Sequence, residues 1–470
     1  MSARAIFVGG TSSNAGKSWM TTAICAWLRG RGVRVAPFKA QNMSNHSFPC
    51  RGGGEIGRAQ VAQAEACGVE PEPAMNPILL KPNGNGTSQV VLHGRPWQTL
   101  TPREYYGAFD TLIGEVVTAY QSLAKRFDAI VIEGAGSVSE LNLRHVDLVN
   151  LGLVTRIGAP WVLVADIERG GVIASVIGSV AVLSPEERRL FRGFLINKFR
   201  GDRTLFDDGR AVLEQRTGAP CLGLFPFAED LRLDAEDSLA VDRRPRRPAP
   251  AGATMAIVQL PRTANATDFR RLDWAEWLTA PPADGRRFDY VILPGTKDTL
   301  GDLAWLERQG LAAWIREQHA EGATIVGVCG GFQMLGETVA DPDAVESIGG
   351  TARGLGLLPI ATELAAGKVT RVVRAKLPRG ASCTAYEIHL GVTTMLAPLP
   401  PFATLDAGAH DGARGNRVLG TYLHGAFEDA SVCAEVFGVA VAPETSKADA
   451  YAAMGHWFAS HAEHVDAWLP

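Results

Sequence analysis

A glycine-rich segment near the start of the chain constrains its fold more than any other feature. Residues 9–18 read Gly-Gly-Thr-Ser-Ser-Asn-Ala-Gly-Lys-Ser, directly after an apolar run at residues 5–8 and directly before a helical pattern at residues 19–29. A glycine-rich turn between a strand and a helix aims backbone N–H groups and the positive end of the helix dipole at one point. The segment therefore predicts a phosphate-binding loop on a parallel α/β sheet.

Two side chains at the end of this loop are expected to work with the backbone. Lys17 supplies a point charge for the terminal phosphates, and the Ser18 hydroxyl can reach a magnesium ion. In the usual pattern the first glycine stands five residues before the second; here that position is a threonine, so the loop is one residue longer. The other loop residues expected to contact phosphate are Gly10, Thr11, Asn14 and Gly16.

Charged residues follow three further strand patterns of the first half. Residues 129–133 and 162–166 are apolar runs that end in Glu133 and Asp166. At the carboxyl edge of a sheet, beside a phosphate loop, such carboxylates are candidate magnesium ligands. Lys39, at the end of the run 33–38, is a second candidate cation for a transferred phosphoryl group.

The chain is long enough for two α/β domains. Its 470 residues exceed one ordinary hydrophobic core, and strand-like runs alternate with helical stretches in both halves. Residues 242–252 are rich in proline and arginine and predict an exposed linker. Their arginines could be taken for a nucleic-acid patch, but the linker is favoured, since no aromatic residue lies between the arginines. We therefore expect a synthetase domain over residues 1–241 and a second domain over residues 253–470.

In the second half the strand and helix patterns resume. Residues 303–319 have the spacing of one amphipathic helix. Four runs predict strands, at residues 255–260, 290–294, 324–328 and 418–422.

The run 324–328 leads into Cys329, which stands in a Gly-Val-Cys-Gly-Gly turn before a helical pattern. Glycines on both sides permit a sharp turn that projects the thiol, and the start of a helix favours the thiolate. A buried structural cysteine would not require three surrounding glycines. We therefore expect Cys329 to be a nucleophile, with the backbone N–H groups of Gly330 and Gly295 as oxyanion donors.

A thiol nucleophile requires a base, and His424 is the favoured candidate. It lies just after the strand pattern 418–422, about ninety-five residues after Cys329. A Cys–His pair is typically far apart in the sequence and adjacent in the fold. His389 is the rival candidate. Three histidines in the polar C-terminal helix have no carboxylate or cysteine at ligand spacing and are expected to be surface residues: His456, His461 and His464.

Composition excludes several other classes of protein. The net charge of -4 does not support binding to nucleic acid or to an anionic membrane. The start of the chain resembles a strand rather than a signal peptide, and no apolar run has the length of a membrane span. The seven cysteines are scattered, which is typical of a reducing compartment, so we expect a cytoplasmic protein.

These motifs resemble those of known families. The first half resembles the dethiobiotin synthetase-like ATP-dependent ligases, which have the same lengthened phosphate loop. The second half resembles the class I glutamine amidotransferase domains, with Cys329 and His424 at the positions of nucleophile and base. The order of motifs along nearly the whole chain resembles the cobyric acid synthase family; these motifs are residues 39–44, 54–60, 76–82, 132–136, 166–171, 197–202, 386–389 and 421–425.

The resemblance implies a fold and a reaction. The fold would be α/β in two domains: a phosphate-loop doubly wound parallel sheet and a class I glutamine amidotransferase-like domain. The reaction would be amidation of the b, d, e and g carboxylates of adenosylcobyrinic acid a,c-diamide. The substrates would be ATP with Mg²⁺, glutamine and the cobalt corrinoid, and ammonia released at Cys329 would displace phosphate from the activated carboxylate.

One position departs from the wider amidotransferase class. That class usually carries a glutamate two residues after the histidine, and here Ala426 stands there. The absence agrees with the cobyric acid synthases and speaks against CTP synthase, which has a comparable layout. The group that orients His424 stays open, with Glu387 as a guess, and we expect weak glutaminase activity when the domain stands alone.

Two alternatives remain open. Cobyrinic acid a,c-diamide synthase has the same domain plan, although residues 39–44 and 54–60 favour cobyric acid synthase. A phosphate-loop switch ATPase would have no use for the cysteine turn and its histidine. Gln60, Asn42 and Asn142 are weak candidates for the substrate pocket, and the sequence does not predict the oligomeric state.

Overall fold

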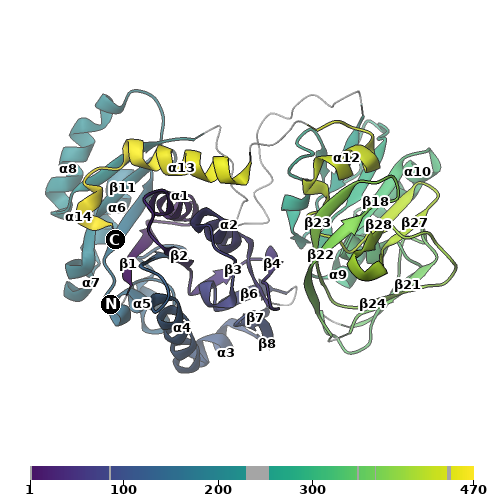
Figure 1. Cartoon of the computed structure of the whole chain (residues 1–470), viewed down its shortest axis with the longest axis horizontal. Helices are drawn as coiled ribbons and strands as arrows, with labels where there is room; N and C mark the ends of the chain where they lie inside the picture. Colours follow the sequence, from purple (N-terminus) through teal and green to yellow (C-terminus); the bar gives the residue numbers. More distant parts are fainter. Residues whose placement is uncertain are drawn as a thin grey trace.

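The computed structural model describes residues 3–83, 86–228, 253–346, 349–365, 367–441 and 446–469. Within these ranges the chain forms two α/β domains that lie side by side (Figure 1), which confirms the expected fold class. The predicted linker, residues 242–252, lies outside the described residues. None of the helices in the described ranges combines the length and apolarity that a membrane crossing requires.

The first domain is built on a six-stranded sheet in which every neighbouring pair is parallel. Its strands are short and almost wholly buried, because helices cover both faces and leave no polar side exposed. In spatial order they are β12 (Cys221–Pro226), β11 (Phe191–Phe199), β10 (Trp161–Asp166), β1 (Arg4–Gly10), β9 (Ala129–Glu133) and β2 (Val35–Phe38). β1 lies inside the sheet with later strands on either side, so the carboxyl ends of β1, β9 and β10 lie next to one another.

The first helix of this domain begins and ends close to where the sequence pattern predicts. The helix after the glycine-rich loop was expected at residues 19–29 and is α1 (Lys17–Gly30). The others are α2 (Arg58–Cys67), α3 (Pro102–Gly107), α4 (Phe109–Ala124), α5 (Leu151–Ile157), α6 (Val172–Ala181), α7 (Pro185–Leu190) and α8 (Asp207–Thr217).

Between β2 and α4 the chain forms two small sheets that the sequence patterns did not predict. One has the order β3 (Gln41–Met43), β6 (Ile78–Pro82), β7 (Ser88–Leu92) and β8 (Arg95–Leu100). The other is a hairpin of β4 (Ser47–Pro49) and β5 (Glu55–Gly57). Strands of three residues are too short for a periodic signal.

The second domain has its own six-stranded sheet. Its order is β15 (Glu276–Leu278), β13 (Met255–Val258), β16 (Tyr290–Leu293), β18 (Thr324–Val328), β28 (Val418–Thr421) and β27 (Ala413–Gly415). All neighbours are parallel except β27, which pairs antiparallel with β28. The four strands expected from the sequence are therefore β13, β16, β18 and β28, within two residues at each end.

Shorter elements surround this sheet. One four-stranded sheet comprises β19 (Thr338–Asp341), β20 (Gly350–Arg353), β21 (Ile360–Glu363) and β24 (Val392–Met395). A second comprises β22 (Val369–Lys376), β23 (Ser382–His389), β25 (Ala403–Leu405) and β26 (His410–Asp411). A two-stranded ladder joins β14 (Thr263–Ala264) to β17 (Gly295–Thr296). The helices are α9 (Thr299–Arg308), α10 (Leu311–Ala320), α11 (Gly330–Met334) and α12 (Ala430–Phe437).

The expectation of one helix over residues 303–319 is wrong. The structure has two helices, α9 and α10, which are separated at Gly310. Gly310 has a φ of 73°, a left-handed conformation that a helix interior does not contain and that glycine adopts at little cost. The apolar spacing continues across the break, which is why the pattern resembled one helix.

The C-terminal helices α13 (Lys447–His461) and α14 (Val465–Trp468) lie on the first domain, although residues 253–470 were expected to form the second (Figure 1). α13 packs along α1: the Trp19 and Trp457 rings are 5.8 Å apart, and Gly455 approaches the backbone of α1 closely. Lys447 forms an ion pair with Glu65 of α2. The apolar side chains of α13 and α14 are buried here in one hydrophobic cluster with those of α1 and α2.

The β4–β5 hairpin of the first domain packs against the second domain. The backbone N–H of Ser47 donates to Asn265 Oδ1 at 3.1 Å, and the Phe48 ring lies 4.7 Å from that of Tyr386. Behind the hairpin, Arg58 at the start of α2 pairs with Glu428 at 2.8 Å. These contacts place the hairpin against the carboxyl edge of the second sheet.

Candidate active sites

The glycine-rich loop closes over the carboxyl end of β1, as a phosphate-binding loop requires. Lys17 Nζ donates to the backbone oxygens of Ser12 at 3.0 Å and Gly136 at 2.8 Å, so the side chain folds back over the loop. Gly16 has a φ of 101°. The loop residues expected from the sequence, from Gly10 to Ser18, thus form one turn around the Lys17 amine.

Glu133 is the centre of a polar cluster at this end of the sheet. It is fully buried and accepts hydrogen bonds from Ser18 Oγ at 2.6 Å, Lys39 Nζ at 2.9 Å and Gln63 Nε2 at 2.5 Å. The structure therefore brings together three of the predicted residues, Ser18, Lys39 and Glu133. Gln63 was not predicted, because it lies in α2 three residues beyond the motif at residues 54–60.

Asp166 lies on the other side of the loop and away from this cluster. It forms an ion pair with Lys198 at 2.7 Å, and Lys198 also donates to the backbone oxygen of Asn14 at 2.8 Å. The geometry therefore gives Asp166 a part in holding the loop through Lys198.

The residues present fit a magnesium ion on one side of the loop. A serine hydroxyl and a carboxylate 2.6 Å apart form an all-oxygen donor pair, which is the kind of ligand that magnesium prefers. The Gln63 side-chain oxygen is buried without a hydrogen-bond partner beside them, and it is a third oxygen of the same kind. Ser18 and Glu133 are thus the residues that would hold the ion.

A prediction follows from the backbone at Gly16. A Cβ atom there would lie 2.0 Å from Asn197 Nδ2 and would have to adopt φ 101°. Gly16→Ala should therefore distort the loop and raise the Kd for ATP by about 10-fold or more, since strain of this kind costs about 1–3 kcal/mol. Gly178→Ala in α6 is the matched control, because nothing lies within 4 Å of its Cβ position. Isothermal titration with ATP measures both, and equal Kd values for both variants would contradict the prediction.

In the second domain, Cys329 stands between β18 and α11 on a strained turn. Its φ of 52° and ψ of -113° are unusual for a residue with a side chain, and they turn the thiol away from the strand. The side chain is 7% exposed, and Sγ lies 3.6 Å from the backbone oxygen of Ile388. This is the geometry of a nucleophile elbow.

His424 follows β28, the parallel neighbour of β18, so that the register brings the two strand ends together. Its Nδ1–H donates to Asp268 Oδ2 at 2.7 Å, and the other Asp268 oxygen accepts from the Gly425 N–H at 2.8 Å. Burial alone would lower the pKa of His424, but the charges of Asp268 and of a Cys329 thiolate raise it to about 10. The site therefore favours the imidazolium form of His424.

Asp268 corrects the guess that Glu387 orients the histidine. Glu387 is held by Arg371, and the nearest histidine to it is His389, at 3.9 Å. Asp268 lies in a 3-10 helix at residues 266–269, 156 positions before His424 in the sequence. No motif surrounds it; the available signal was only that it follows β13 and so belongs to the same sheet edge.

The rival histidine, His389, lies in the same pocket but in a different setting. Its ring stacks on Tyr422 with centroids 3.8 Å apart, and burial lowers its pKa to about 4. It has no carboxylate at hydrogen-bond distance among the described residues, whereas His424 has one. The geometry therefore favours His424 as the base.

The two glycines expected to donate to an oxyanion lie beside the thiol. Gly330 is the first residue of α11, where a backbone N–H has no acceptor within the helix. Gly295 begins β17, and a Cβ added to it would lie 2.9 Å from His424 Cε1 and 3.6 Å from Cys329 Cβ. The absence of a side chain at residue 295 thus leaves space between the side chains of Cys329 and His424.

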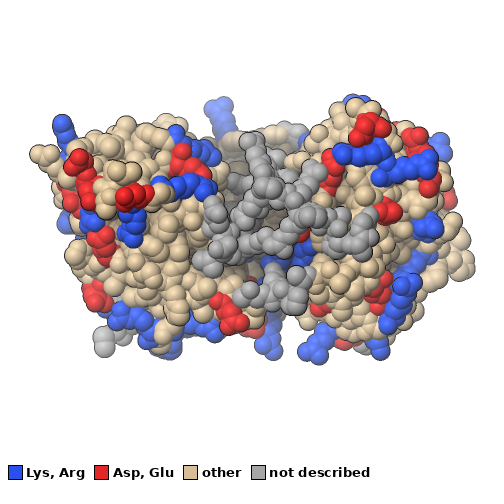
Figure 2. All heavy atoms as spheres, turned by 90° about the horizontal axis from the view of Figure 1, so that it is seen from above, with Lys and Arg blue, Asp and Glu red and all other residues tan. Residues whose placement is uncertain are grey.

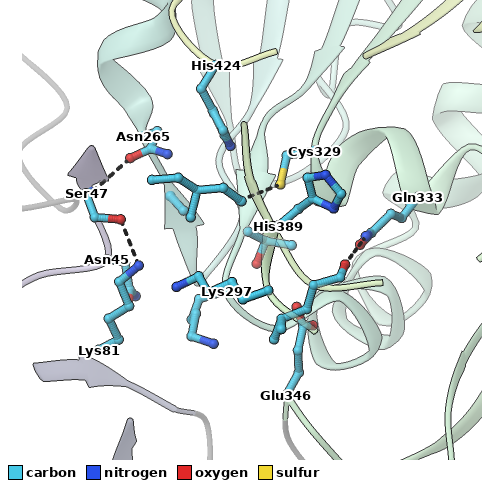
Figure 3. Close-up of a pocket in the computed structure, with 15 residues that line it drawn as sticks. Asn45, Ser47, Lys81, Asn265, Lys297, Cys329, Gln333, Glu346, His389 and His424 are labelled. Atoms are coloured by element: carbon cyan, nitrogen blue, oxygen red, sulfur yellow. Dashed lines mark hydrogen bonds between the residues drawn. The ribbon is translucent and has the colours of Figure 1, made fainter. Parts of the chain in front are cut away.

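The pocket at Cys329 lies between the domains (Figure 3). The second domain contributes Cys329, His424, His389 and most of the lining, and the first domain contributes a segment at its β4–β5 hairpin and one lysine. Those first-domain residues are Asn45, Ser47 and Lys81. The pocket of the second domain is therefore completed by the first.

The three weak candidates for the substrate pocket do not line the pocket at Cys329. Asn42 donates to Gln60 at 2.9 Å, and both are buried in the first domain. Asn142 lies in a 3-10 helix at residues 141–146. Of the C-terminal histidines, His461 contacts the backbone oxygen of Trp457 at 2.7 Å and lies against Phe225.

Charges on the face seen in Figure 2 are mixed. Lysine and arginine side chains lie among aspartate and glutamate side chains on both domains of that face.

Comparison with known families agrees with this division of the chain. Residues 6–240 match the model of the CobQ/CobB/MinD/ParA nucleotide binding domain. Residues 254–432 match that of the CobB/CobQ-like glutamine amidotransferase domain. The fold and the two sites thus define a protein that joins a phosphate-loop nucleotide-binding domain to a glutamine amidotransferase domain.

Curated relatives extend over nearly the whole chain. A cobyric acid synthase of Parabacteroides distasonis is 43% identical over 91% of this chain and 89% of its own length. Those of Bacteroides fragilis and Synechocystis are 45% and 43% identical, again over 91% of this chain and over 88% and 87% of their own. The chain belongs to the cobyric acid synthase family. A crystal structure of a glutamine amidotransferase matches over 37% of this chain and 92% of its own, at 18% identity; its TM-score of 0.30 is too low to support an argument.

Proposed function

We propose that the protein is a glutamine-hydrolysing carbon–nitrogen ligase that amidates the b, d, e and g carboxylates of adenosylcobyrinic acid a,c-diamide. The observation that carries the proposal is the union of the two sites in one chain whose likeness to cobyric acid synthases spans 91% of its length. The thiol site provides ammonia, and the phosphate-loop site activates a carboxylate.

At the thiol site, the Cys329 thiolate attacks the side-chain amide carbon of glutamine. The N–H groups of Gly330 and Gly295 stabilise the oxyanion. The carbon–nitrogen bond then breaks, and the leaving nitrogen takes a proton from the His424 imidazolium, so that ammonia departs and a thioester remains. His424, held by Asp268 at 2.7 Å, next removes a proton from water, which hydrolyses the thioester to glutamate.

At the phosphate-loop site, a substrate carboxylate oxygen attacks the γ-phosphorus of ATP, and ADP leaves. Lys17 and Lys39 lie where they can bind the terminal phosphates and balance their charge. Magnesium, held by Ser18 and Glu133, would supply further charge neutralisation. Ammonia then attacks the acyl phosphate carbon, the carbon–oxygen bond breaks, and an amide and phosphate result.

The compartment and the coupling are part of the proposal. All seven cysteines are free and buried, which suits a cytoplasmic enzyme. Because the first domain lines the pocket at Cys329, ammonia is released at the domain boundary rather than on an outer face.

A corrinoid panel tests the substrate. Cobyrinic acid and adenosylcobyrinic acid a,c-diamide are each incubated with the protein, ATP, magnesium and glutamine, and ADP release is followed. The proposal expects the diamide to stimulate ADP release about 10-fold or more above cobyrinic acid, since a site built for one substrate discriminates by contacts in the transition state. The opposite preference would favour the a,c-diamide synthase, and corrinoid-independent ATP hydrolysis would favour a switch ATPase.

A further inference from the structure

The pocket at Cys329 contains more charge than its own residues neutralise. Three lysines line it: Lys81, Lys297 and Lys368. Two of these lysines, Lys81 and Lys368, have an anionic partner, because both form ion pairs with the carboxylate of Glu55 in the β4–β5 hairpin. Within the described parts of the chain, Lys297 is the lining lysine without such a partner.

Lys297 presents its amine to the pocket. Its Nζ makes no hydrogen bond or ion pair with any residue that the structure describes. Burial lowers the pKa of Lys297, and the charge of Glu346 acts against this. Lys297 is half-buried, and a partly desolvated cation without a partner is unfavourable, so this position suits a bound anion.

Glu346 is the complementary group. It is 8% exposed, and one carboxylate oxygen accepts from the Thr299 N–H at 2.8 Å, which fixes its orientation at the start of α9. It forms no ion pair with a cation in the described ranges, and burial raises its pKa to about 7 against the attraction of Lys297. Lys297 and Glu346 thus affect each other's pKa without forming an ion pair, which leaves space for a ligand between them.

We propose that Lys297 binds the α-carboxylate of the substrate glutamine and Glu346 its α-ammonium group, an inference that rests on the proposed function. In Figure 3 both side chains lie on the side of the pocket opposite His424. A glutamine whose amide carbon faces Cys329 and His424 therefore directs its zwitterionic end towards them. One half-buried cation and one buried anion match the two charges of an amino acid.

The pair selects among amides. An amide that lacks the amino group leaves Glu346 without a cation, and one that lacks the carboxylate leaves Lys297 without an anion. Both losses leave a buried charge unpaired. The pair therefore favours free glutamine over other primary amides.

Substrate analogues in combination with variants test this assignment. Initial rates of hydrolysis are measured for glutamine, for glutaramic acid, which lacks the amino group, and for 4-aminobutanamide, which lacks the carboxylate. The variants are Lys297→Met, of similar length, and Glu346→Gln, which can still accept from Thr299. Lys376→Met and Glu363→Gln, exposed positions of the same domain, are the matched controls. Thermal midpoints check that each variant is folded.

The expected result is a specific pattern of KM. Each pocket variant raises the KM for glutamine by about 30-fold or more, with a smaller change in kcat, because truncating one partner of a buried charge pair costs about 2–5 kcal/mol. Glu346→Gln has little effect on glutaramic acid, and Lys297→Met has little effect on 4-aminobutanamide. The two exposed controls behave like the wild type.

Two results would overturn the inference. An unchanged glutamine KM in both pocket variants, while the wild type hydrolyses glutamine, refutes the pair alone. An equal loss on all three amides in a folded variant assigns a structural role instead and also refutes it. A wild type that hydrolyses no glutamine refutes the proposed function together with the pair.

Discussion

Cys329→Ala should abolish glutamine-dependent amidation while ammonium salts still support amidation of the same carboxylates. The thiol is the atom that bonds to glutamine, and removal of a catalytic nucleophile lowers kcat by about 10⁴-fold or more. The phosphate-loop site is unchanged by this substitution, because it lies in the other domain and is built from β1, β9 and α1. Glutamate release and amide formation are measured in parallel, with glutamine and with ammonium chloride.

Cys383→Ala is the matched control for this substitution. Cys383 is a buried, free cysteine of the same domain that does not line the pocket. It should retain glutamine-dependent activity within about 3-fold, as a substitution away from the site acts mainly on stability. If Cys329→Ala still used glutamine, the nucleophile would be another residue. If it lost the ammonia reaction as well, the two sites would not be separable as described.

Asp268→Asn should lower kcat for glutamine hydrolysis by about 10³–10⁴-fold, with a small change in KM. An asparagine can keep the contact to His424 but cannot stabilise the imidazolium, and it permits the wrong tautomer. Burial lowers the pKa of His424, but Asp268 and Cys329 together raise it to about 10. Without the charge of Asp268 the pKa falls, so the imidazolium is lost at lower pH and the alkaline limb of kcat/KM moves to lower pH. Hydrolysis rates between pH 6 and pH 10 measure both effects.

Glu387→Gln is the control that separates the two candidate carboxylates. Its partner Arg371 lies mainly in solvent, and His389 is 3.9 Å away, so the rate should stay within about 5-fold of the wild type. The interpretation of Asp268 would be contradicted if the asparagine variant were nearly as active as the wild type while Glu387→Gln were not.

The sequence was sufficient to predict those elements whose motif residues lie close together in the chain. The phosphate loop and the cysteine turn each combine a buried strand, glycines and a helix start, and these features depend on neighbours in the chain. Because parallel strands end at one edge, the same reasoning places His424 next to Cys329 once β18 and β28 are neighbours. The strand limits followed from apolar runs that helices cover on both faces.

The sequence was not sufficient where a contact joins distant segments. Asp268 meets His424 across 156 positions, without a spacing rule between them. Because Ala426 stands where related domains have a glutamate, the sequence suggested that His424 lacks an orienting carboxylate. In the structure Asp268, from another part of the same sheet edge, is that carboxylate. Ala426 is itself fully buried, so a glutamate side chain there would meet the core.

The same limit applies to the boundary between the domains. Helix α13 is weakly amphipathic by its sequence, and its buried apolar residues pack in a hydrophobic cluster with α1. Lys297 and Glu346 likewise lie outside the motifs. Glu55 lies within the motif at residues 54–60, but the motif does not predict its ion pairs with Lys81 and Lys368. The relation of these residues to Cys329 exists only after the β4–β5 hairpin packs against the second domain.

The most direct test of the account uses glutamine labelled with ¹⁵N at its amide. The protein is incubated with adenosylcobyrinic acid a,c-diamide, ATP, magnesium and this glutamine, and the corrinoid is followed by mass spectrometry. The account predicts successive conversion of the b, d, e and g acids to amides, each carrying ¹⁵N, with one ADP formed per amide. A corrinoid that stays unchanged while ATP and glutamine are consumed would contradict the assigned substrate, and amides without ¹⁵N would contradict the assigned source of nitrogen.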